Sequence, residues 1–376
     1  MSHSTRPGEI ALARPDITDQ EIEAVVAVLR SPNLSLGPKV PEFEEAFARL
    51  CGTEHAVACN SGTSALHMVV RAMGLGPGDE VITTPFSFVA SANCILFERA
   101  KPVFVDMDPQ YWCLDPARIE AAITPATKAI LTVDVFGIIP DMDAIRAIAR
   151  RHNLRVIEDS CEAAGATRGG AVAGSLGDAG VFGFYPNKQI TTGEGGMVVT
   201  DDAEIAALCR SIRNQGRAAT AGWLAHERLG YNFRLADINC AIGVVQVARL
   251  PEILAARARV AALYDARLKD EPRLTQQATP PGSTKSWFVY VVKLADDYPV
   301  GARDEIMAGL RAAGIGCNNY FSPIHLQPFY QADLGCRAGD FPICETVANR
   351  TIALPFHAFL TEQDVDRVVR TLRSLL

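Results

Sequence analysis

Short apolar runs alternate with longer amphipathic segments along residues 55–158. The short runs predict buried strands, and the segments whose apolar side chains recur every three or four residues predict helices. We expect strands at 55–59, 80–84, 101–105, 127–133 and 155–158, and helices at 65–75, 86–98, 115–122 and 141–152. This alternation predicts an α/β protein whose central sheet is mostly parallel and carries helices on both faces.

Two further amphipathic helices are expected before the first strand, at 17–31 and 39–51. In the first of them, Thr18 followed by Glu21 has the spacing of a capping box, in which each side chain bonds the other residue's backbone N–H. Because both helices precede the sheet, we expect them to wrap around the outside of the large domain.

The pattern changes after residue 200. We expect a helix at 203–214, a long helical segment at about 237–269 that is interrupted near Pro251, a strand at 286–294, and helices at 302–313, 344–349 and 362–375. Residues 270–284 are rich in Pro, Gly, Gln, Ser and Thr, and mark a boundary. We predict a large domain over residues 1–250 and a smaller C-terminal α/β domain over residues 251–376.

One lysine lies on a glycine-rich turn between two short apolar strands, at residues 180–200. This residue, Lys188, lies between two rigid elements, so we expect its side chain to be held in place and not to extend freely into solvent. A lysine amine that loses its proton attacks aldehydes and forms Schiff bases. We therefore consider Lys188 as the attachment point of pyridoxal phosphate (PLP). For a single lysine, an ordinary surface position in a β-turn is the more frequent alternative.

Polar turns follow several of the expected strands, where ligands of parallel sheets bind. In the turn at 60–64, Gly62 allows close backbone approach, and Thr63 and Ser64 offer hydroxyl groups at the start of a helix. Free backbone N–H groups at a helix start favour an anion, so this turn predicts a phosphate site. Simple N-capping of the helix is the alternative.

Two carboxylates follow another strand. Asp159 lies at the strand end, where it could pair with the protonated ring nitrogen that PLP needs, and Glu162 lies three residues further on. An N-cap role is an equal alternative for Asp159 alone. After a third strand, Phe86 or Phe88 could stack on a flat ring, although core packing is the usual role of either residue. The phosphate turn, the aromatic residue, the aspartate and the lysine together indicate a PLP site more strongly than any one of them alone.

Composition and charge narrow the classes of function. The chain has 376 residues, 48% of them apolar, and a formal net charge of −7, which argues against nucleic acid or an anionic membrane as a partner. No apolar run reaches the roughly 18 residues of a membrane span, and the N-terminus lacks a secretory signal, so we expect a cytoplasmic protein. The ten cysteines form no Cys-x-x-Cys pair, so we expect free thiols and no metal site.

The motifs resemble those of the DegT/DnrJ/EryC1/StrS family of PLP-dependent sugar aminotransferases, which have fold-type I of the aspartate aminotransferase superfamily. The resemblance covers nearly the whole chain. It rests on NSGTSAL at 60–66, EDSCEAAG at 158–165, YPNK at 185–188 with TTGEGG at 191–196, and GYNFR at 230–234. The chain is therefore expected to have a large PLP-binding domain and a smaller C-terminal domain.

The resemblance implies a role for each of these residues. Lys188 would form the Schiff base with PLP, Asp159 would pair with the ring nitrogen, and Glu162 would contact the ring. Gly62 and Thr63 would hold the phosphate. A related branch of the family carries histidine in place of the lysine and catalyses dehydration, and the lysine argues against that branch.

The resemblance also implies a homodimer with shared active sites. Asn232 would reach the phosphate bound by the neighbouring subunit, and Phe88 matches the stacking aromatic better than Phe86 does. The segment with Tyr320 and His325 resembles the lining of the sugar pocket, where a structural role for the histidine is an even alternative.

The chain departs from the family pattern at one position. Five residues before the lysine, the family commonly has a serine whose hydroxyl binds the phosphate, and this chain has Gly183. A water molecule, Ser64 or a backbone N–H could take over that contact.

The expected function is transfer of an amino group, from L-glutamate by family resemblance, to a keto-deoxy-sugar attached to a nucleotide. The product would be an amino sugar for a polysaccharide or another glycoconjugate. Two alternatives remain: an aminotransferase that acts on a keto-cyclitol or another keto-sugar, and a PLP-binding regulator without catalysis. A substrate screen would distinguish the first alternative from the expected function, and salt-sensitive DNA binding would indicate the second alternative.

Overall fold

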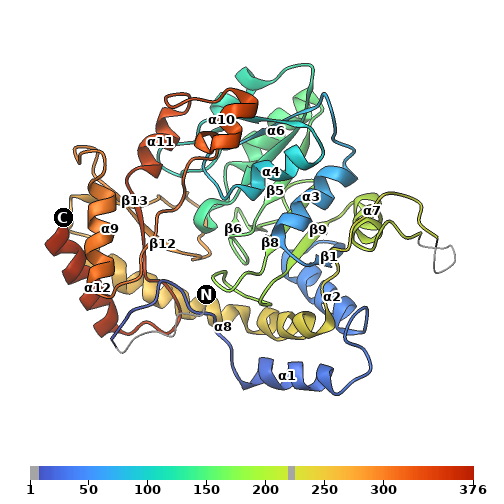
Figure 1. Ribbon diagram of the computed structural model, residues 1–376, viewed down its shortest axis with the longest axis horizontal. Helices are drawn as coiled ribbons and strands as arrows, with labels where there is room; N and C mark the ends of the chain where they lie inside the picture. Colours follow the sequence, from blue (N-terminus) through green and yellow to red (C-terminus); the bar gives the residue numbers. More distant parts are fainter. Residues whose placement is uncertain (1–7, 219–224) are drawn as a thin grey trace.

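A seven-stranded sheet forms the centre of the molecule (Figure 1). The computed structural model describes residues 8–218 and 225–376. The strand order is β1-β9-β8-β5-β4-β2-β3, and every neighbouring pair is parallel except those that involve β9. The strands are β1 (His55–Cys59), β2 (Glu80–Thr83), β3 (Lys101–Phe104), β4 (Thr127–Val133), β5 (Arg155–Asp159), β8 (Ala179–Gly183) and β9 (Gly196–Thr200). The predicted α/β class with a mostly parallel sheet is confirmed.

Helices cover both faces of this sheet, as the alternating sequence pattern predicts. They are α2 (Lys39–Cys51), α3 (Gly62–Ala72), α4 (Ala90–Phe97), α5 (Pro116–Ile119), α6 (Met142–His152) and α7 (Ala203–Arg213). The helix expected at 86–98 begins later, at Ala90, because the Phe86 N–H donates to the Thr84 hydroxyl and residues 84–89 form a turn. This turn becomes part of the candidate site.

A smaller unit is built from the C-terminal part of the chain. It contains a three-stranded sheet, β10 (Leu274–Thr275), β12 (Tyr290–Leu294) and β13 (Thr351–Leu354), and the helices α9 (Ala302–Ala312) and α12 (Glu362–Leu375), which share one hydrophobic cluster. Helices α10 (Pro328–Leu334) and α11 (Pro342–Ala348) pack instead against the large unit, near α4 (Figure 1). The strand expected at 286–294 begins only at Tyr290. Residue Ser286 instead donates its N–H to the Gly137 carbonyl and so lies outside the ladder.

Helix α8 (Asp237–Leu268) runs along one side of both units (Figure 1). The predicted interruption near Pro251 is wrong, since the helix continues through this residue. Proline removes one backbone N–H, and the burial of Leu250 and Ile253 on either side holds the helix together. The predicted domain boundary at 250/251 falls inside this helix and stays a prediction.

Helix α8 is also the one described helix whose length and composition would allow it to cross a membrane. It packs against α1 (Asp19–Leu29), α2 and α12, and buries charged residues such as Arg249 and Arg257. These contacts are typical of a core helix.

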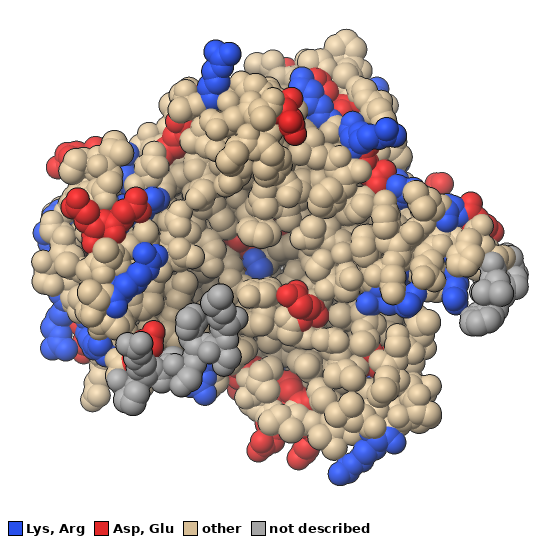
Figure 2. Space-filling view, viewed as in Figure 1, with Lys and Arg blue, Asp and Glu red and all other residues tan. Residues whose placement is uncertain are grey.

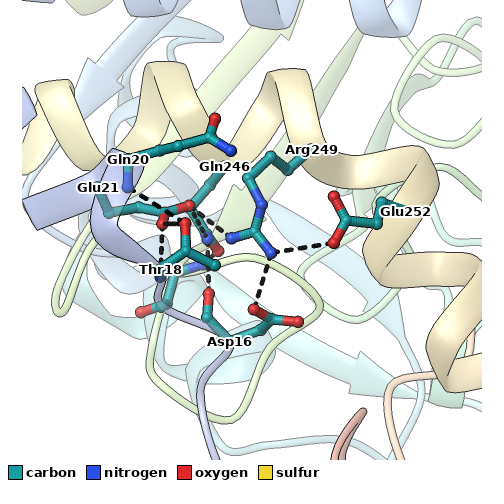
Figure 3. Close-up of polar contacts among 8 residues, drawn as sticks. Asp16, Thr18, Gln20, Glu21, Gln246, Arg249 and Glu252 are labelled. Atoms are coloured by element: carbon teal, nitrogen blue, oxygen red, sulfur yellow. Dashed lines mark hydrogen bonds and ion pairs between the residues drawn. The ribbon is translucent and has the colours of Figure 1, made fainter.

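A buried polar network attaches α1 to α8 (Figure 3). The predicted capping box is present, with Thr18 and Glu21 bonded to each other. The second oxygen of Glu21 accepts from Arg249 Nη1 at 2.7 Å and from Gln246 Nε2 at 2.8 Å, and Asp16 accepts from Arg249 Nη2 at 2.9 Å. Glu21 is only 1% exposed, so its charge depends on these partners.

The network makes a testable prediction about acid stability. Burial alone would raise the pKa of Glu21, but hydrogen bonds from Thr18, Gln246 and Arg249 outweigh it and lower the pKa from 4.5 to about 2. The carboxylate therefore stabilises the fold fully above about pH 4.5, and this contribution is lost as the pH falls toward 2.

We expect Glu21→Gln to lower the free energy of unfolding at pH 7 by about 2 kcal/mol and to flatten its decline between pH 4.5 and 2. Urea unfolding at several pH values measures both effects. Glu45→Gln is the control, since its ion pair with Arg49 is 72% exposed on both sides. Equal pH profiles for wild type and Glu21→Gln would contradict the prediction.

Candidate active site

A cavity of about 510 Å³ opens at the carboxyl ends of the parallel strands. Figure 2 shows a hollow in the face viewed, with a Lys or Arg side chain at its floor and an Asp or Glu side chain at its rim. The cavity is lined by predicted site residues from five separate parts of the chain, among them Gly62, Thr63, Phe88, Asp159, Glu162, Lys188 and Tyr320. The fold thus brings most of the predicted site together.

Lys188 lies on the turn between β8 and β9, and its side chain is only 16% exposed. Its Nζ lies 3.6 Å from Glu162 Oε1 and 4.0 Å from the centroid of the Phe288 ring. The aromatic face attracts the ammonium group and excludes water from one side of it. The lysine is therefore held inside the cavity, as its sequence context predicts.

Asp159 ends β5, next to Val181 of β8, and is 5% exposed. Its Oδ2 accepts from the Ser91 hydroxyl at 2.7 Å, and its Oδ1 accepts from the Cys161 N–H at 3.2 Å. Ser87, in the turn before α4, is in turn 2.7 Å from Ser91 of α4, so both serines support the carboxylate. These bonds fix the orientation of the Asp159 side chain at the cavity wall.

Glu162 is 5% exposed and also lines the cavity. Its Oε2 accepts from the Phe136 N–H at 2.9 Å, while Oε1 faces Lys188. Burial raises the pKa of Glu162 above its usual value, and the nearby Lys188 charge partly opposes that rise. Glu162 can therefore exchange a proton with its surroundings closer to neutral pH than an exposed glutamate can.

The predicted phosphate turn forms the start of α3. Ser61 is the N-cap and accepts from the Ser64 N–H at 3.1 Å, while Gly62 and Thr63 line the cavity. A Cβ on Gly62 would lie 3.0 Å from Cys161 Sγ and 3.2 Å from Gly183 Cα, so a larger residue would force its neighbours to shift.

Ser64 is not among the residues that line the cavity, and its predicted contact with the phosphate stays a prediction. It is 8% exposed, and its hydroxyl accepts from the Ser61 hydroxyl at 3.0 Å within the helix cap. Gly183, in contrast, lines the cavity beside this turn, and a Cβ added there would lie 3.4 Å from Cys161 Sγ, an ordinary contact.

The structure separates the two aromatic alternatives. Phe88 is 61% exposed and lines the cavity, whereas Phe86 is fully buried between Trp112, Phe136 and Phe321. Phe88 is thus the ring that can stack on a bound group. Tyr320 also lines the cavity, where its hydroxyl accepts from Asn187 Nδ2 at 3.3 Å.

His325 does not line the cavity, so the prediction that it contacts the sugar is not supported by its position. It is fully buried, its Nε2 lies 3.0 Å from Glu345 Oε1, and its ring packs against Phe341. This is the structural role that the sequence left as an even alternative.

Asn232 is exposed and lies outside the cavity of its own chain. The segment that carries it is fixed by Tyr231 and Phe233, whose rings stack at 4.7 Å, and by a bridge between Asn232 and Asn214. The predicted contact with a neighbouring subunit stays a prediction.

Three contributors to the site lie outside the sequence predictions. Ser91 has a signal in the sequence, because it follows β2 in the region where ligands of parallel sheets bind. Phe288 and Phe136 carried no such signal, since each reaches the site only through the packing of distant segments.

The lining fits PLP. A lysine amine, a carboxylate and a helix N-terminus face one cavity, and the close approach of Gly62 to Gly183 leaves the backbone of the turn open to a phosphate. These groups match the aldehyde, the ring nitrogen and the phosphate of the cofactor.

Comparisons with known proteins agree with this chemistry. The model of the DegT/DnrJ/EryC1/StrS aminotransferase family matches residues 15–373. The chain is 43% identical over 372 residues to the GDP-perosamine synthase of Caulobacter vibrioides, a match that covers 98% of both chains.

Solved structures agree as well. PseC of Helicobacter pylori, an aminotransferase involved in the biosynthesis of pseudoaminic acid, has a TM-score of 0.93 and 30% identity, with 98% of this chain and 99% of PseC covered. The PLP form of Spr1654 from Streptococcus pneumoniae has a TM-score of 0.93 and 29% identity, with 98% of both chains covered.

The space at Gly183 makes a second prediction. A serine there would find room for its Cβ and would add a hydroxyl to the cavity beside the phosphate turn. We expect Gly183→Ser to tighten PLP binding by about 1 kcal/mol, or roughly fivefold. Fluorescence titration of the cofactor-free protein measures this affinity. Gly183→Ala is the matched control without the hydroxyl, and equal affinities of the two variants would refute the idea.

The contact between Glu162 and Lys188 makes a third prediction. Glu162→Gln keeps the size of the side chain and removes the negative charge 3.6 Å from Nζ. Because that charge favours a protonated nitrogen, the pH midpoint of the cofactor band at roughly 400–430 nm should shift down by about one unit. Glu194→Gln, which also changes a lining residue, is the control. An unchanged or higher midpoint in Glu162→Gln would contradict this role.

Proposed function

Because the chain belongs to the DegT/DnrJ/EryC1/StrS aminotransferase family, we propose that it transfers an amino group from L-glutamate to a keto-deoxy-sugar linked to a nucleotide. The protein is a PLP-dependent sugar aminotransferase. The amino donor, the nucleotide linkage and the assignment of individual residues are the parts that we propose. The product is an amino sugar for a polysaccharide or another glycoconjugate.

One observation carries the proposal: the Lys188 amine and the Asp159 carboxylate line one cavity with the N-terminus of α3. The lysine would hold the aldehyde carbon of the cofactor, the carboxylate would accept the ring N–H, and the helix N-terminus would hold the phosphate. When bound, PLP supplies an electron sink for the carbanion that forms after a proton leaves a substrate carbon.

Lys188 has a second task in this reaction. Once the amino donor has displaced it, its amine takes a proton at Nζ from one carbon and returns it to another, as general base and then general acid. Phe288 limits the directions in which the amine can move, because its ring lies 4.0 Å from Nζ. Glu162 Oε1, at 3.6 Å, can hold or release a proton beside it.

The two substrates bind one after the other at the same place, as expected of a ping-pong enzyme. Tyr320 is our candidate for the sugar side of the cavity, because its hydroxyl lies at the wall and is oriented by Asn187. We further propose a homodimer in which the exposed Asn232 contacts the phosphate site of the partner subunit. A cytoplasmic location fits this role.

The role of Lys188 makes a fourth prediction. Lys188→Ala should lose at least about 10³-fold in amino transfer, together with the band at roughly 400–430 nm that L-glutamate abolishes in the wild type. Absorbance titration with glutamate, and mass spectrometry after borohydride reduction, test the donor and the attachment point. A variant that still transfers the amino group would overturn the assignment.

Lys285→Ala is the matched control for this experiment. Burial lowers the pKa of Lys285 to about 8, so its amine is a chemically plausible competitor for an aldehyde. Its Nζ instead donates to Gln277 Oε1 at 3.0 Å, and it does not line the cavity. We expect this variant to keep the band and the borohydride-trapped peptide of the wild type.

A further inference from the structure

Three side chains of α8 hold the backbone of the turn that carries Lys188. Asn239 Nδ2 donates to the Thr192 carbonyl at 2.7 Å, and Gln246 Oε1 accepts from the Thr191 N–H at 3.1 Å. Arg257 Nη2 donates to the carbonyl of Lys188 itself at 2.9 Å. Residues separated by 7 and 11 positions lie on one face of a helix, so a single stripe of α8 faces this turn.

Arg257 makes a further contact on the other side of the lysine. Its Nη1 donates to the Phe288 carbonyl at 3.5 Å, and the ring of Phe288 is the one that packs against Lys188 Nζ. One guanidinium group therefore joins the backbone of the lysine to the backbone of the residue that limits its side chain. Its planar, fixed donors suit such a two-point contact.

The burial of Arg257 makes these contacts informative. The residue is 3% exposed, and its hydrogen bonds go to backbone carbonyls instead of carboxylates. Burial lowers the pKa of Arg257 to about 10, which leaves it charged at neutral pH. A buried cation without a carboxylate partner is costly. An apolar side chain would be cheaper here if the position served packing alone.

We propose that Arg257 is a positioning residue for Lys188. Through the carbonyls of Lys188 and Phe288, Arg257 fixes the position of the lysine backbone and the direction of the lysine side chain. This inference rests on the proposed role of Lys188 as the residue that binds PLP. Displacement of a reacting group by about 1 Å can cost about a hundredfold in rate, so a loss of these bonds should affect the proton transfers of Lys188 more than substrate binding.

Gln246 extends this contact to the N-terminal segment. Its Oε1 holds the Thr191 N–H, while its Nε2 donates to Glu21 Oε1 and to the Asp16 carbonyl, both at 2.8 Å (Figure 3). Hydrogen bonds thus connect the lysine turn to α8, and further hydrogen bonds connect α8 to the buried network at α1. Arg249 donates to the same Glu21 oxygen as Gln246 and so belongs to that network as well.

The test compares Arg257→Gln with Arg257→Lys and uses Arg259→Gln as the control, because Arg259 also lies on α8 and donates to two backbone carbonyls, those of Ala358 and Leu360. In the cofactor-free protein, hydrogen–deuterium exchange of the amides at 188–192 should become at least about tenfold faster in Arg257→Gln. In the holoenzyme, the rate constant at which a saturating amino donor removes the cofactor band should fall by about ten- to a hundredfold. The half-saturating donor concentration should change by less than about threefold.

Arg257→Lys keeps the charge and can reach one carbonyl, so it should recover part of both losses. Arg259→Gln should leave exchange at 188–192 and the band kinetics unchanged. The inference is overturned if Arg257→Gln matches the wild type in exchange and rate, or if Arg259→Gln reproduces both of its defects. Should Arg257→Gln fail to fold, the same two criteria apply to Arg257→Lys.

The outcomes also separate this inference from the proposed function. If borohydride traps no cofactor on Lys188 of the wild type, the proposed function fails. Exchange in the cofactor-free protein still reports whether Arg257 holds the turn. If the wild type is trapped normally and the Arg257 variants behave like it, only the positioning role fails.

Discussion

A lysine has a long, flexible side chain, so its use as a proton carrier depends on how firmly the backbone below it is held. In this protein the bond between Arg257 and the Lys188 carbonyl fixes that backbone from α8, and the Phe288 ring limits the other end of the side chain. The amine then has few positions available, and Glu162 lies beside one of them. In the proposed mechanism, a helix that packs as ordinary core therefore also restricts the directions in which the lysine amine can react.

The parallel sheet provides the second constraint, because it places the ends of several strands at one edge. Val133 of β4 pairs with Asp159 of β5, and Asp159 pairs with Val181 of β8, so the carboxylate lies next to the strand that leads to Lys188. The pairing of neighbouring parallel strands fixes the spacing between these strand ends independently of the loops that follow them. The ring-nitrogen partner and the lysine can therefore be far apart in sequence and still face one cofactor.

The sequence predicts well those parts of the site that follow from this edge rule. Lys188, Asp159 and the turn at Gly62 each lie at a strand end or helix start, and the pattern of apolar residues is enough to locate such points. The same pattern does not predict the direction in which a side chain points. Ser64 and His325 are residue types that could bind a ligand. The Ser64 hydroxyl instead accepts a bond within the helix cap, and His325 contacts Glu345 and Phe341.

Local sequence patterns also do not predict contacts between segments that are distant in the chain. Pro251 reads as a helix break, yet buried neighbours on both sides carry α8 through it. Arg257 has no role in the sequence predictions, and only the packing of α8 against the turn between β8 and β9 shows its carbonyl partners.

The departure at Gly183 has a physical explanation in the same packing. The Cα of Gly183 approaches Gly62 closely, since a Cβ on Gly62 would lie 3.2 Å from it, while Cys161 Sγ fills the space below both. Two glycines and a sulfur atom thus form one wall of the phosphate turn. In the proposed phosphate site, the N-terminus of α3 directs backbone N–H groups at the cavity. The phosphate would then depend more on the helix than on a side chain, which makes the close approach of Gly62 the stricter requirement of the two positions.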